Sequence, residues 1–324
     1  MKIVVYWPSA PKEALDILVE GLSRYGEVLL ARSFEEALSF VVDAEVFVGG
    51  VFNEVLRVGS KLRFFHVVYA GVDGLDLELA RSKGVLVASA KGVNSFYVAE
   101  LALALMLALV KKVTFYDRMA KQGVFPRYDW SYSMDTLRGK KVVILGYGGI
   151  GRELAKLLKP LGARVVGVRR SARERRDDYA DEIVPVEELE RVVEGADFLV
   201  VAAPLTRETR GLVGERLLRK LRRGAYVVNV SRGHVVEEQA LAKLVEEGWL
   251  EGVGLDVWWV YPWEDSTAYS KLGINRNEKV IATPHRGGFV REAFIDIAKF
   301  IVENVGRYAR GETPLNLVDY EKGY

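Results

Sequence analysis

Three glycines, Gly146, Gly148 and Gly151, have the spacing of a turn that binds phosphate groups. The apolar run 142–145 before them predicts a strand, and a helical pattern over 153–161 follows them. In such a strand–turn–helix the first glycine permits a tight turn, the second lets backbone approach a pyrophosphate, and the third lets helix and strand pack closely. The helix N-terminus then offers N–H groups and a positive dipole end to the phosphates. This segment therefore predicts a dinucleotide site.

The residues after the next predicted strand, 164–168, indicate which dinucleotide is bound. NAD-binding folds place an Asp or Glu there, about 20 residues after the glycines, to bind the ribose hydroxyls. This chain has Arg169, Arg170 and Ser171 instead, and the first acidic residue is Glu174. A carboxylate would repel a ribose 2′-phosphate, whereas a guanidinium binds phosphate through two parallel hydrogen bonds. The pattern predicts a preference for NADP(H), with NAD(H) possible. The alternative is a solvated loop of scattered charges.

Two side chains after later strands have the chemistry that hydride transfer to a carbonyl requires. The protein must orient the carbonyl, polarise it and donate a proton to the developing alkoxide. Arg232 follows the apolar strand 226–230, and its planar fork can bind a carboxylate and contact the adjacent carbonyl. His285 follows the strand 280–282, and histidine is the usual acid–base group near neutral pH. The alternatives are a surface arginine in a turn and a structural histidine.

The composition predicts a soluble globular chain without thiol or metal chemistry. Half of its 324 residues are hydrophobic, 28% are charged, and the formal net charge is +2, so nothing suggests a nucleic acid as a partner. The absence of cysteine excludes disulfides and thiolate sites. The other two histidines, His66 and His234, lie outside the strand-end pattern and form no His-x-x-x-His pair, so no metal site is expected.

The chain shows no segment typical of secretion or of a membrane span. Its first six residues predict a strand rather than a signal peptide. The most apolar stretch, 98–110, is too short to cross a bilayer and contains Glu100. We therefore expect a cytoplasmic protein. Only two glutamines accompany abundant Glu, Lys and Arg, a composition that favours a thermophilic source.

Short apolar runs alternate with helical patterns in two successive series, which predicts α/β architecture with two doubly wound parallel sheets. The expected strands are 3–6, 27–30, 46–49, 64–68 and 85–88 in the first series, and 141–145, 163–168, 198–202, 226–230, 252–256 and 280–282 in the second. We expect one domain over 1–96 and 288–324 and a dinucleotide-binding domain over 97–287. Ligands of open α/β sheets bind at the carboxyl ends of the strands, so we expect the reaction in a cleft between the sheets.

Seven short segments, in order along the chain, match the motifs of one enzyme family. They lie at 70–73, 93–100, 146–152, 204–206, 229–233, 255–257 and 283–288. With them the chain resembles the D-isomer-specific 2-hydroxyacid dehydrogenases over nearly its whole length, and in particular members similar to NADP-dependent glyoxylate or hydroxypyruvate reductases. The resemblance implies a Rossmann cofactor domain inserted into a split, flavodoxin-like substrate domain. It also implies a homodimer.

The same resemblance assigns roles to individual residues. Arg232 would bind the substrate carboxylate and carbonyl, His285 would donate the proton, and Asp256 would touch the nicotinamide amide. The implied substrate site comprises Tyr69, Ala70, Gly71, Val72 and Arg232, with backbone N–H groups near Gly71 and Val72 holding the carboxylate. The implied cofactor site comprises Gly146, Tyr147, Gly148, Gly149, Ile150, Gly151, Arg169, Arg170, Ser171, Pro204, Thr209, Val230, Ser231, Arg232, Asp256, His285 and Gly287.

One position departs from the family's pattern Asp-Val-Phe-x-x-Glu-Pro. Residues 256–262 read Asp-Val-Trp-Trp-Val-Tyr-Pro, so Tyr261 stands where the family has the Glu that orients the catalytic histidine. A phenol can hydrogen-bond an imidazole, but it is neutral near pH 7 and gives the imidazolium no charged support. We include Tyr261 among the catalytic residues. The alternatives are that Glu264 or Asp265 substitutes for the missing carboxylate, or that Tyr261 only packs.

The aromatic cluster at Trp258, Trp259, Tyr261 and Trp263 has two interpretations. It walls a pocket for an apolar substrate side chain, or some of its rings pack an interface, and we favour packing.

Two functions follow from these observations. The first is an oxidoreductase that transfers a hydride between NADP(H) and a 2-oxo acid or D-2-hydroxy acid. The alternative is a dinucleotide-sensing regulatory protein with weak or no turnover, which only the missing Glu favours. The presence of Arg232 and His285 argues against it, because a sensor needs neither.

Overall fold

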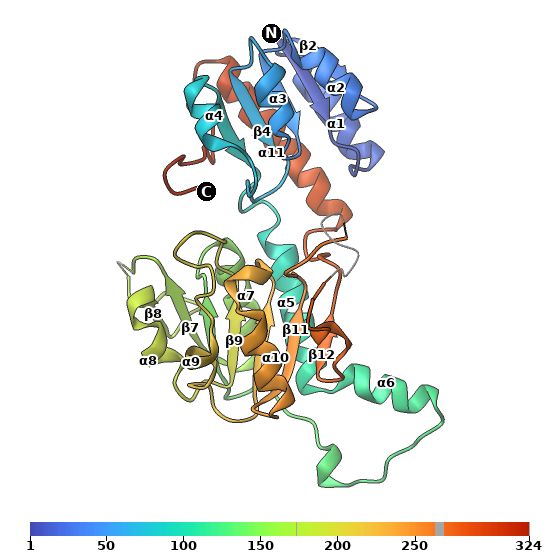
Figure 1. Cartoon of the computed structure of the whole chain (residues 1–324), viewed down its shortest axis with the longest axis vertical. Coiled ribbons are helices and arrows are strands. Elements are labelled where there is room, and N and C mark those ends of the chain that lie inside the picture. The colour runs from blue at the N-terminus through green and yellow to red at the C-terminus, as the bar shows by residue number, and fades with distance from the viewer. Residues whose placement is uncertain (173, 263–268, 324) are drawn as a thin grey trace. The chain divides into compact units, whose positions relative to one another are not determined.

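The computed structural model describes residues 1–172, 174–262 and 269–323, which form two compact units (Figure 1). One unit consists of Met1–Asn94 and Phe289–Tyr324, and the other of Ser95–Gly288. The chain thus begins in the first unit, builds the whole of the second, and returns to the first. Each unit is an α/β body around a parallel sheet, which confirms the predicted fold class.

The sheet of the first unit is parallel throughout. The elements of this unit are β1 (Lys2–Tyr6), α1 (Lys12–Leu22), β2 (Glu27–Leu30), α2 (Phe34–Val41), β3 (Val46–Gly49), α3 (Asn53–Val58), β4 (Phe64–Val67), α4 (Leu77–Ser82), β5 (Leu86–Ser89) and α11 (Arg291–Ala309). The strand order is β2-β1-β3-β4-β5, the flavodoxin-like order. Helices α1 and α11 cover one face of the sheet, and α2, α3 and α4 cover the other.

The second unit also has a parallel sheet with helices on both faces. Its elements are α5 (Ser95–Val110), α6 (Val113–Lys121), β6 (Lys141–Leu145), α7 (Gly149–Leu158), β7 (Arg164–Arg169), β8 (Glu182–Pro185), α8 (Leu189–Val193), β9 (Phe198–Val201), α9 (Glu215–Leu218), β10 (Ala225–Asn229), α10 (Glu238–Glu246), β11 (Leu250–Leu255) and β12 (Val280–Ala282), with short 3₁₀ turns between some of them. The strand order is β12-β11-β10-β9-β6-β7-β8. Numbered from β6, it is the Rossmann order 3-2-1-4-5-6 with a seventh strand added.

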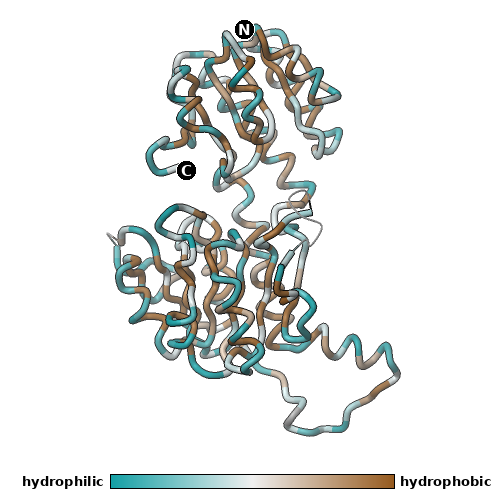
Figure 2. Tube along the Cα trace, in the orientation of Figure 1, coloured by the Kyte–Doolittle hydropathy of each residue, from teal (hydrophilic) through white to brown (hydrophobic). Residues whose placement is uncertain are grey.

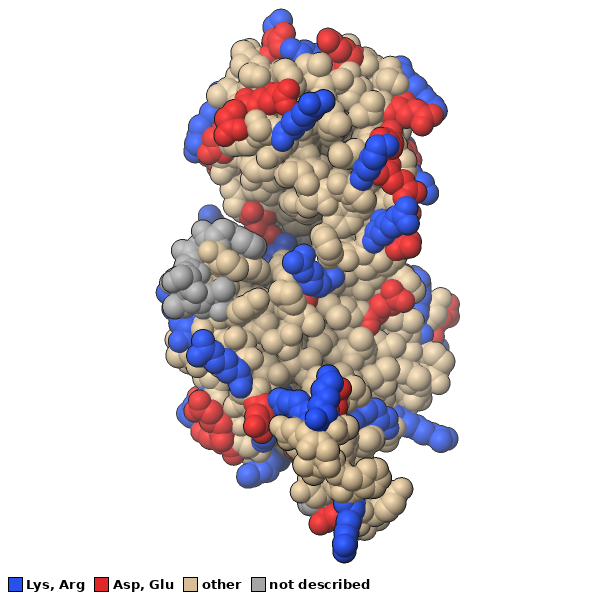
Figure 3. Space-filling view, turned by 90° about the vertical axis from the view of Figure 1, so that its right-hand side faces the viewer, with Lys and Arg blue, Asp and Glu red and all other residues tan. Residues whose placement is uncertain are grey.

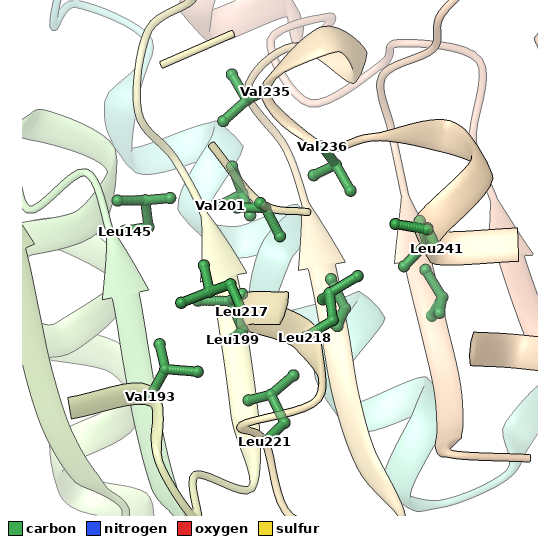
Figure 4. Close-up of a cluster of buried hydrophobic side chains, with 14 of the residues drawn as sticks. Leu145, Val193, Leu199, Val201, Leu217, Leu218, Leu221, Val235, Val236 and Leu241 are labelled. Atoms are coloured by element: carbon green, nitrogen blue, oxygen red, sulfur yellow. The ribbon is translucent and has the colours of Figure 1, made fainter. Parts of the chain in front are cut away.

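The strands of both sheets are short and apolar because helices bury both of their faces. The hydropathy trace shows these strands as mostly hydrophobic segments (Figure 2). In the second unit, α5 and α7 pack on one face, and α8, α9 and α10 pack on the other. The second of these cores is drawn in Figure 4, where Leu199 and Val201 of β9 lie together with Leu217 and Leu218 of α9. These cores fix the strand ends that carry the candidate site.

The structure differs from the sequence expectations in a few elements. The helix after the glycine turn begins at Gly149 rather than near residue 153, so that Gly149 and Gly151 lie in its first turn. Strand β8 and helices α3 and α6 were not expected. β8 has only Ile183 and Val184 between Glu182 and Pro185, and α3 is six residues long, so neither has a clear apolar pattern.

Helix α6 and the segment 122–136 form an arm that projects from the second unit (Figure 1). No residue of α6 is buried. The segment after it carries aromatic side chains that face solvent: Phe125 is 92% exposed, Trp130 is 91% exposed, and Tyr128 is also fully exposed. Large apolar side chains on the surface of one chain indicate an interaction site.

In the described part of the chain, no helix combines the length and the apolar character that crossing a bilayer requires. Lys and Arg side chains stand among Asp and Glu over the face drawn in Figure 3. The cytoplasmic location stays a prediction.

Candidate active site

The glycine turn between β6 and α7 has two positions where only glycine fits. Gly146 has a φ of 101°, in the left-handed region, and a Cβ there would lie 2.3 Å from the backbone nitrogen of Ala203. A Cβ on Gly151 would lie 2.4 Å from the carbonyl oxygen of Gly146. The first glycine thus permits the turn and the third permits close packing of helix and strand, as the motif requires.

Gly148, in contrast, faces open space. No atom of the described residues outside its own neighbourhood lies within 4 Å of the Cβ that another residue would carry there. Gly148 is also the N-cap of α7, and the helix begins at Gly149 and Ile150 without a capping side chain in the described structure. The open space at Gly148, at the N-terminus of a ten-residue helix, is a cradle that fits a pyrophosphate.

Tyr147 shapes this turn from inside. Its ring packs on Gly167, where a Cβ would lie 2.4 Å from Cγ of Tyr147, and the side chain is 4% exposed. Its hydroxyl donates to Asp177 at 2.9 Å. Burial, and then the hydrogen bond to Asp177, raise the pKa of the Tyr147 phenol above its ordinary value. The side chain is therefore part of the scaffold, and the backbone is what this residue offers a ligand.

Arg169 and Arg170 stand at the end of β7, as expected. Nε of Arg169 donates to the carbonyl oxygen of Ser171 at 2.7 Å, which folds this side chain along its own loop. Arg170 forms an ion pair of 3.5 Å with Glu208, in the loop after β9. Both partners are more than half exposed, so water weakens this pair and a phosphate can compete for the guanidinium. In the same loop, Thr209 Oγ1 donates to the carbonyl of Pro204 at 2.6 Å.

Arg232 lies beyond β10 in a turn that Asn229 shapes. The Asn229 side chain is fully buried, and its Oδ1 accepts from the backbone N and the Oγ of Ser231 at 3.1 and 3.0 Å. Its Nδ2 donates to the carbonyl of Arg232 at 3.0 Å. Arg232 is half-buried, and its Nη1 donates to the carbonyl of Ser231 at 2.9 Å. The turn from Val230 to Gly233, here called the Arg232 loop, is thus held by a buried amide.

His285 is exposed and lies in the loop 283–287 after β12, here called the His285 loop. Its φ is +56°, a left-handed conformation that is uncommon outside glycine and persists only where surrounding contacts hold it. The His285 N–H donates to the carbonyl of Thr283 at 3.0 Å. The loop therefore presents the imidazole from a strained backbone.

Asp256 supplies three of the contacts that hold this loop. Its Oδ1 accepts from Thr283 Oγ1 at 2.6 Å and from the Arg286 N–H at 2.8 Å. Its Oδ2 accepts from the Gly287 N–H at 2.9 Å. Asp256 is 1% exposed and follows β11, the strand beside β12. In this structure its carboxylate organises the His285 loop, and the expected contact with the nicotinamide amide stays a proposal.

Tyr261 is in hydrogen-bond contact with the candidate acid. Its Oη lies 2.9 Å from Nδ1 of His285. The phenol donates when Nδ1 carries no proton, and Nδ1–H donates to the phenol oxygen in the imidazolium. The residue at the usual Glu position thus keeps the orienting contact without the charge. Glu264 and Asp265, the possible substitutes, lie outside the described residues.

The neighbouring tryptophans are packing residues. Trp258 is 1% exposed and Trp259 is 8% exposed, and each indole N–H donates to a backbone carbonyl. Both rings belong to the buried core of the second unit, so they pack inside this unit rather than at the interface that had been expected. Trp263 lies outside the described residues.

The expected substrate loop lies in the first unit, after β4. Tyr69 is 48% exposed, Ala70 and Gly71 are partly exposed, and Val72 is buried. The Tyr69 carbonyl accepts from the Ala90 N–H at 3.0 Å, which ties the loop to the residue just after β5. The loop therefore stands at the carboxyl edge of its sheet, the edge where ligands of such sheets bind.

The comparisons with known proteins agree with this geometry. Residues 103–287 match the model of the "D-isomer specific 2-hydroxyacid dehydrogenase, NAD binding domain". The chain is 34% identical over 276 residues to a glyoxylate reductase of Pyrococcus horikoshii, covering 83% of this chain and 80% of the relative. The chain belongs to the D-isomer specific 2-hydroxyacid dehydrogenases. It is therefore an oxidoreductase that transfers a hydride between a nicotinamide cofactor and a 2-oxo acid.

Further similarities extend over nearly the whole chain. A glyoxylate reductase of Korarchaeum cryptofilum is 34% identical over 272 residues, covering 83% of this chain and 79% of the relative. A solved structure of a D-isomer specific 2-hydroxyacid dehydrogenase family protein of Aeromonas salmonicida aligns with a TM-score of 0.85. It is 25% identical and covers 98% of this chain and 99% of the other.

The structure brings the expected residues of the second unit to one edge of its sheet. The glycine turn follows β6, and Arg169, Arg232, Asp256 and His285 lie at or beyond the ends of β7, β10, β11 and β12. All seven strands are parallel, so these ends lie at the same edge. The sequence did not predict the hydrogen bonds that support these residues, above all that of the Trp258 indole. A buried indole N–H needs a hydrogen-bond partner, so a tryptophan just after an apolar strand was the sequence feature that could have indicated this bond.

Proposed function

We propose that this chain is an NADP(H)-preferring reductase of small 2-oxo acids, of the kind that glyoxylate represents. The observation that supports it most is the placement of Arg232, Asp256 and His285 beyond three adjacent parallel strands, in the sheet that also carries the glycine turn. Relatives named as glyoxylate reductases favour a small substrate.

The residues of the second unit have separate roles in this proposal. The Gly148 cradle and the N-terminus of α7 hold the pyrophosphate of the cofactor, which supplies the hydride when bound. The Arg232 guanidinium binds the substrate carboxylate and polarises the neighbouring carbonyl, because charge that develops on the oxygen is stabilised by a fixed cation. In the first unit, the backbone N–H groups near Gly71 and Val72 contribute to carboxylate binding.

His285 donates the proton to the developing alkoxide. Its exposed imidazole is in contact with Tyr261 through Nδ1, and in this proposal Nε2 carries the proton that is transferred. Because the phenol is neutral, the imidazolium form is favoured less than it would be beside a carboxylate. Tyr261 thus orients the ring and fixes which nitrogen faces the substrate.

Arg169 and Arg170 support the cofactor preference. They stand at the strand end that meets the adenosine ribose in this fold. A 2′-phosphate bound there would lie beside two guanidinium groups, and no acidic residue stands at the end of β7. Glu208 pairs with Arg170 from the neighbouring loop, and its exposed ion pair is weak enough for a phosphate to replace it. NADH would bind without this contribution.

We also propose a homodimer, whose interface includes the arm 113–136. Phe125, Tyr128 and Trp130 are exposed on the arm. Burying an aromatic side chain removes about 150–250 Å² of surface from water, so six such rings from two copies bury roughly 1,200 Å². That area reaches the lower end of stable protein interfaces, about 1,200–2,000 Å². The cytoplasmic location and the thermophilic source remain proposals that only the sequence supports.

The test is the initial rate of NADPH oxidation with a panel of 2-oxo acids of increasing size, repeated with NADH. The proposal expects turnover with NADPH and the smallest acids, and slower turnover with NADH. Saturable binding of NADPH without turnover on any 2-oxo acid would contradict it and would favour the dinucleotide sensor.

A further inference from the structure

The segment that follows β11 lies between the two loops that carry the candidate catalytic residues. In the sheet, β11 pairs with β10 on one side and with β12 on the other. The Arg232 loop follows β10, and the His285 loop follows β12. A residue just beyond β11 can therefore contact both loops, and Trp258 does so.

The backbone of Trp258 packs directly on the Arg232 loop. A Cβ on Gly233 would lie 2.3 Å from both the carbonyl carbon and the carbonyl oxygen of Trp258. Real Cβ atoms do not approach backbone this closely, so Gly233 is required for the contact. The residue beside Arg232 is thus pressed against the Trp258 peptide.

The side chain of Trp258 holds the His285 loop. Its Nε1–H donates to the carbonyl oxygen of Thr283 at 2.9 Å. The same oxygen accepts the backbone N–H of His285 at 3.0 Å. The indole therefore fixes the peptide group on which the left-handed backbone of His285 depends. The indole is itself buried, because Trp258 is 1% exposed, and it lies edge-on to Tyr269, with ring centroids 4.9 Å apart.

We propose that Trp258 is a positioning residue, whose indole N–H sets the His285 imidazole against Tyr261 and whose backbone sets the Arg232 loop. The phenylalanine of the family's usual pattern cannot make this hydrogen bond, because it has no N–H. The proposal rests on the assignment of His285 as the proton donor. It extends that assignment to a residue that touches neither substrate nor cofactor.

The neighbouring Trp259 provides a matched control. It is also buried, and its Nε1–H also donates to a backbone carbonyl, that of Val236, at 2.8 Å. That carbonyl lies outside the His285 loop. Trp258→Phe and Trp259→Phe therefore remove the same chemical group from adjacent buried positions, and only the first releases the Thr283 carbonyl.

The first measurement is kinetic. In Trp258→Phe, kcat for 2-oxo acid reduction should fall about tenfold, the effect of one lost hydrogen bond that positions a reacting group. The substrate KM and the Kd of NADPH should stay within about threefold, since the backbone contact with Gly233 is kept. Trp259→Phe should keep kcat within about twofold at a similar loss of Tm. Equal losses of kcat in the two variants would overturn the proposal.

A double-mutant cycle tests whether Trp258 affects catalysis through the contact between His285 and Tyr261. Tyr261→Phe should lower kcat in the wild-type and Trp259→Phe backgrounds, and it should have little further effect in Trp258→Phe, where the ring is already misplaced. Additive losses in the Trp258 cycle would show that the indole acts independently of the His285–Tyr261 contact, and would overturn the proposal.

The third measurement needs no activity, so it separates this proposal from the proposed function. The chain has only three histidines, and the buried His66 of the first unit serves as the internal reference in the NMR spectrum. The imidazole resonances of His285 should shift in Trp258→Phe and not in Trp259→Phe.

If Trp258→Phe does not fold, the variant His285→Asn is measured in its place, because Asn tolerates a left-handed backbone. It should shift the indole N–H resonance of Trp258 and not that of Trp259. Unmoved resonances would overturn the proposal, and an inactive wild type with these shifts would contradict the proposed function alone.

Discussion

The phenol oxygen of Tyr261 lies 2.9 Å from Nδ1 of His285, so the candidate proton donor is oriented by a neutral partner. A carboxylate at this position would hold the ring and also stabilise its charged form. A phenol does only the first. The chain thus separates two functions that one Glu combines in the family's usual pattern, and each can be tested by itself.

Restoring the carboxylate should change the pH dependence of the reaction. In Tyr261→Glu, the negative charge favours the imidazolium of His285, so the fall of kcat/KM for reduction should move to higher pH. The comparison is a kcat/KM profile for both proteins with the best 2-oxo acid of the panel. Tyr261→Phe is the control, since it removes the hydrogen bond and adds no charge. A profile that does not move in Tyr261→Glu would mean that His285 is not the acid or that another carboxylate already supports it.

Reversing the charge at the end of β7 should reverse the cofactor preference. Arg169→Asp loses a charge-assisted contact worth about 1.5–3 kcal/mol and adds repulsion of the 2′-phosphate, so NADPH binding should weaken at least tenfold. NADH binding should change little. The Kd of each cofactor is measured by fluorescence titration, with Arg164→Asp, an exposed arginine at the opposite end of β7, as the control. Equal weakening of both cofactors would place Arg169 outside the ribose site.

Removing the Arg232 guanidinium should reduce activity much more than stability. Arg232→Ala removes carboxylate binding and carbonyl polarisation together, and we expect a loss of about 3–4 kcal/mol in kcat/KM, roughly 10²–10³-fold. The Tm should change little, because the turn is held by the buried Asn229 side chain rather than by the guanidinium. Near wild-type kinetics would show that Arg232 does not act on the substrate.

The first unit should lose stability in acid through His66. This imidazole is fully buried between Phe64 and Phe300, and burial lowers its pKa to about 4. Between the ordinary pKa of 6.5 and pH 4, the unfolded chain binds a proton that the folded chain does not. Stability should therefore fall by about 3 kcal/mol as pH drops through this window.

Urea denaturation at pH 7 and pH 4.5 measures this effect. His66→Phe should be less sensitive to this pH change than the wild type, whereas a change at the exposed His234 should leave the sensitivity unaltered. The same sensitivity in all three proteins would contradict the assignment to His66.

The exposed arm should control the oligomeric state. Replacing Phe125 and Trp130 by Ser removes two large apolar side chains from the proposed interface, and the dissociation constant of a dimer should rise at least 100-fold. Light scattering after size-exclusion chromatography detects the change. A double variant at Leu30 and Leu86, exposed on the first unit, is the control. A wild type that is monomeric at micromolar concentration would contradict the homodimer directly.

Much of this structure could be predicted from periodicity and turn chemistry, because these depend on neighbours in sequence. The glycine turn, Arg169 at the end of β7 and His285 beyond β12 all follow from a local pattern. The contacts that hold these residues do not. Asp256 reaches the His285 loop, and the Trp258 indole reaches Thr283, only because β11 and β12 are adjacent in the sheet. The left-handed backbone of His285 likewise depends on contacts from outside its own segment.

The split of the first unit along the chain has a consequence for the order in which the protein is made. Helix α11 comes from the last part of the chain, yet Ile301 and Val305 complete the apolar layer that α1 begins with Leu18 and Leu22. A ribosome releases the whole of residues 95–288 before it makes that helix. The second unit can thus assemble its sheet while the first still exposes one apolar face. The unit whose synthesis begins first is therefore the unit whose chain is completed last.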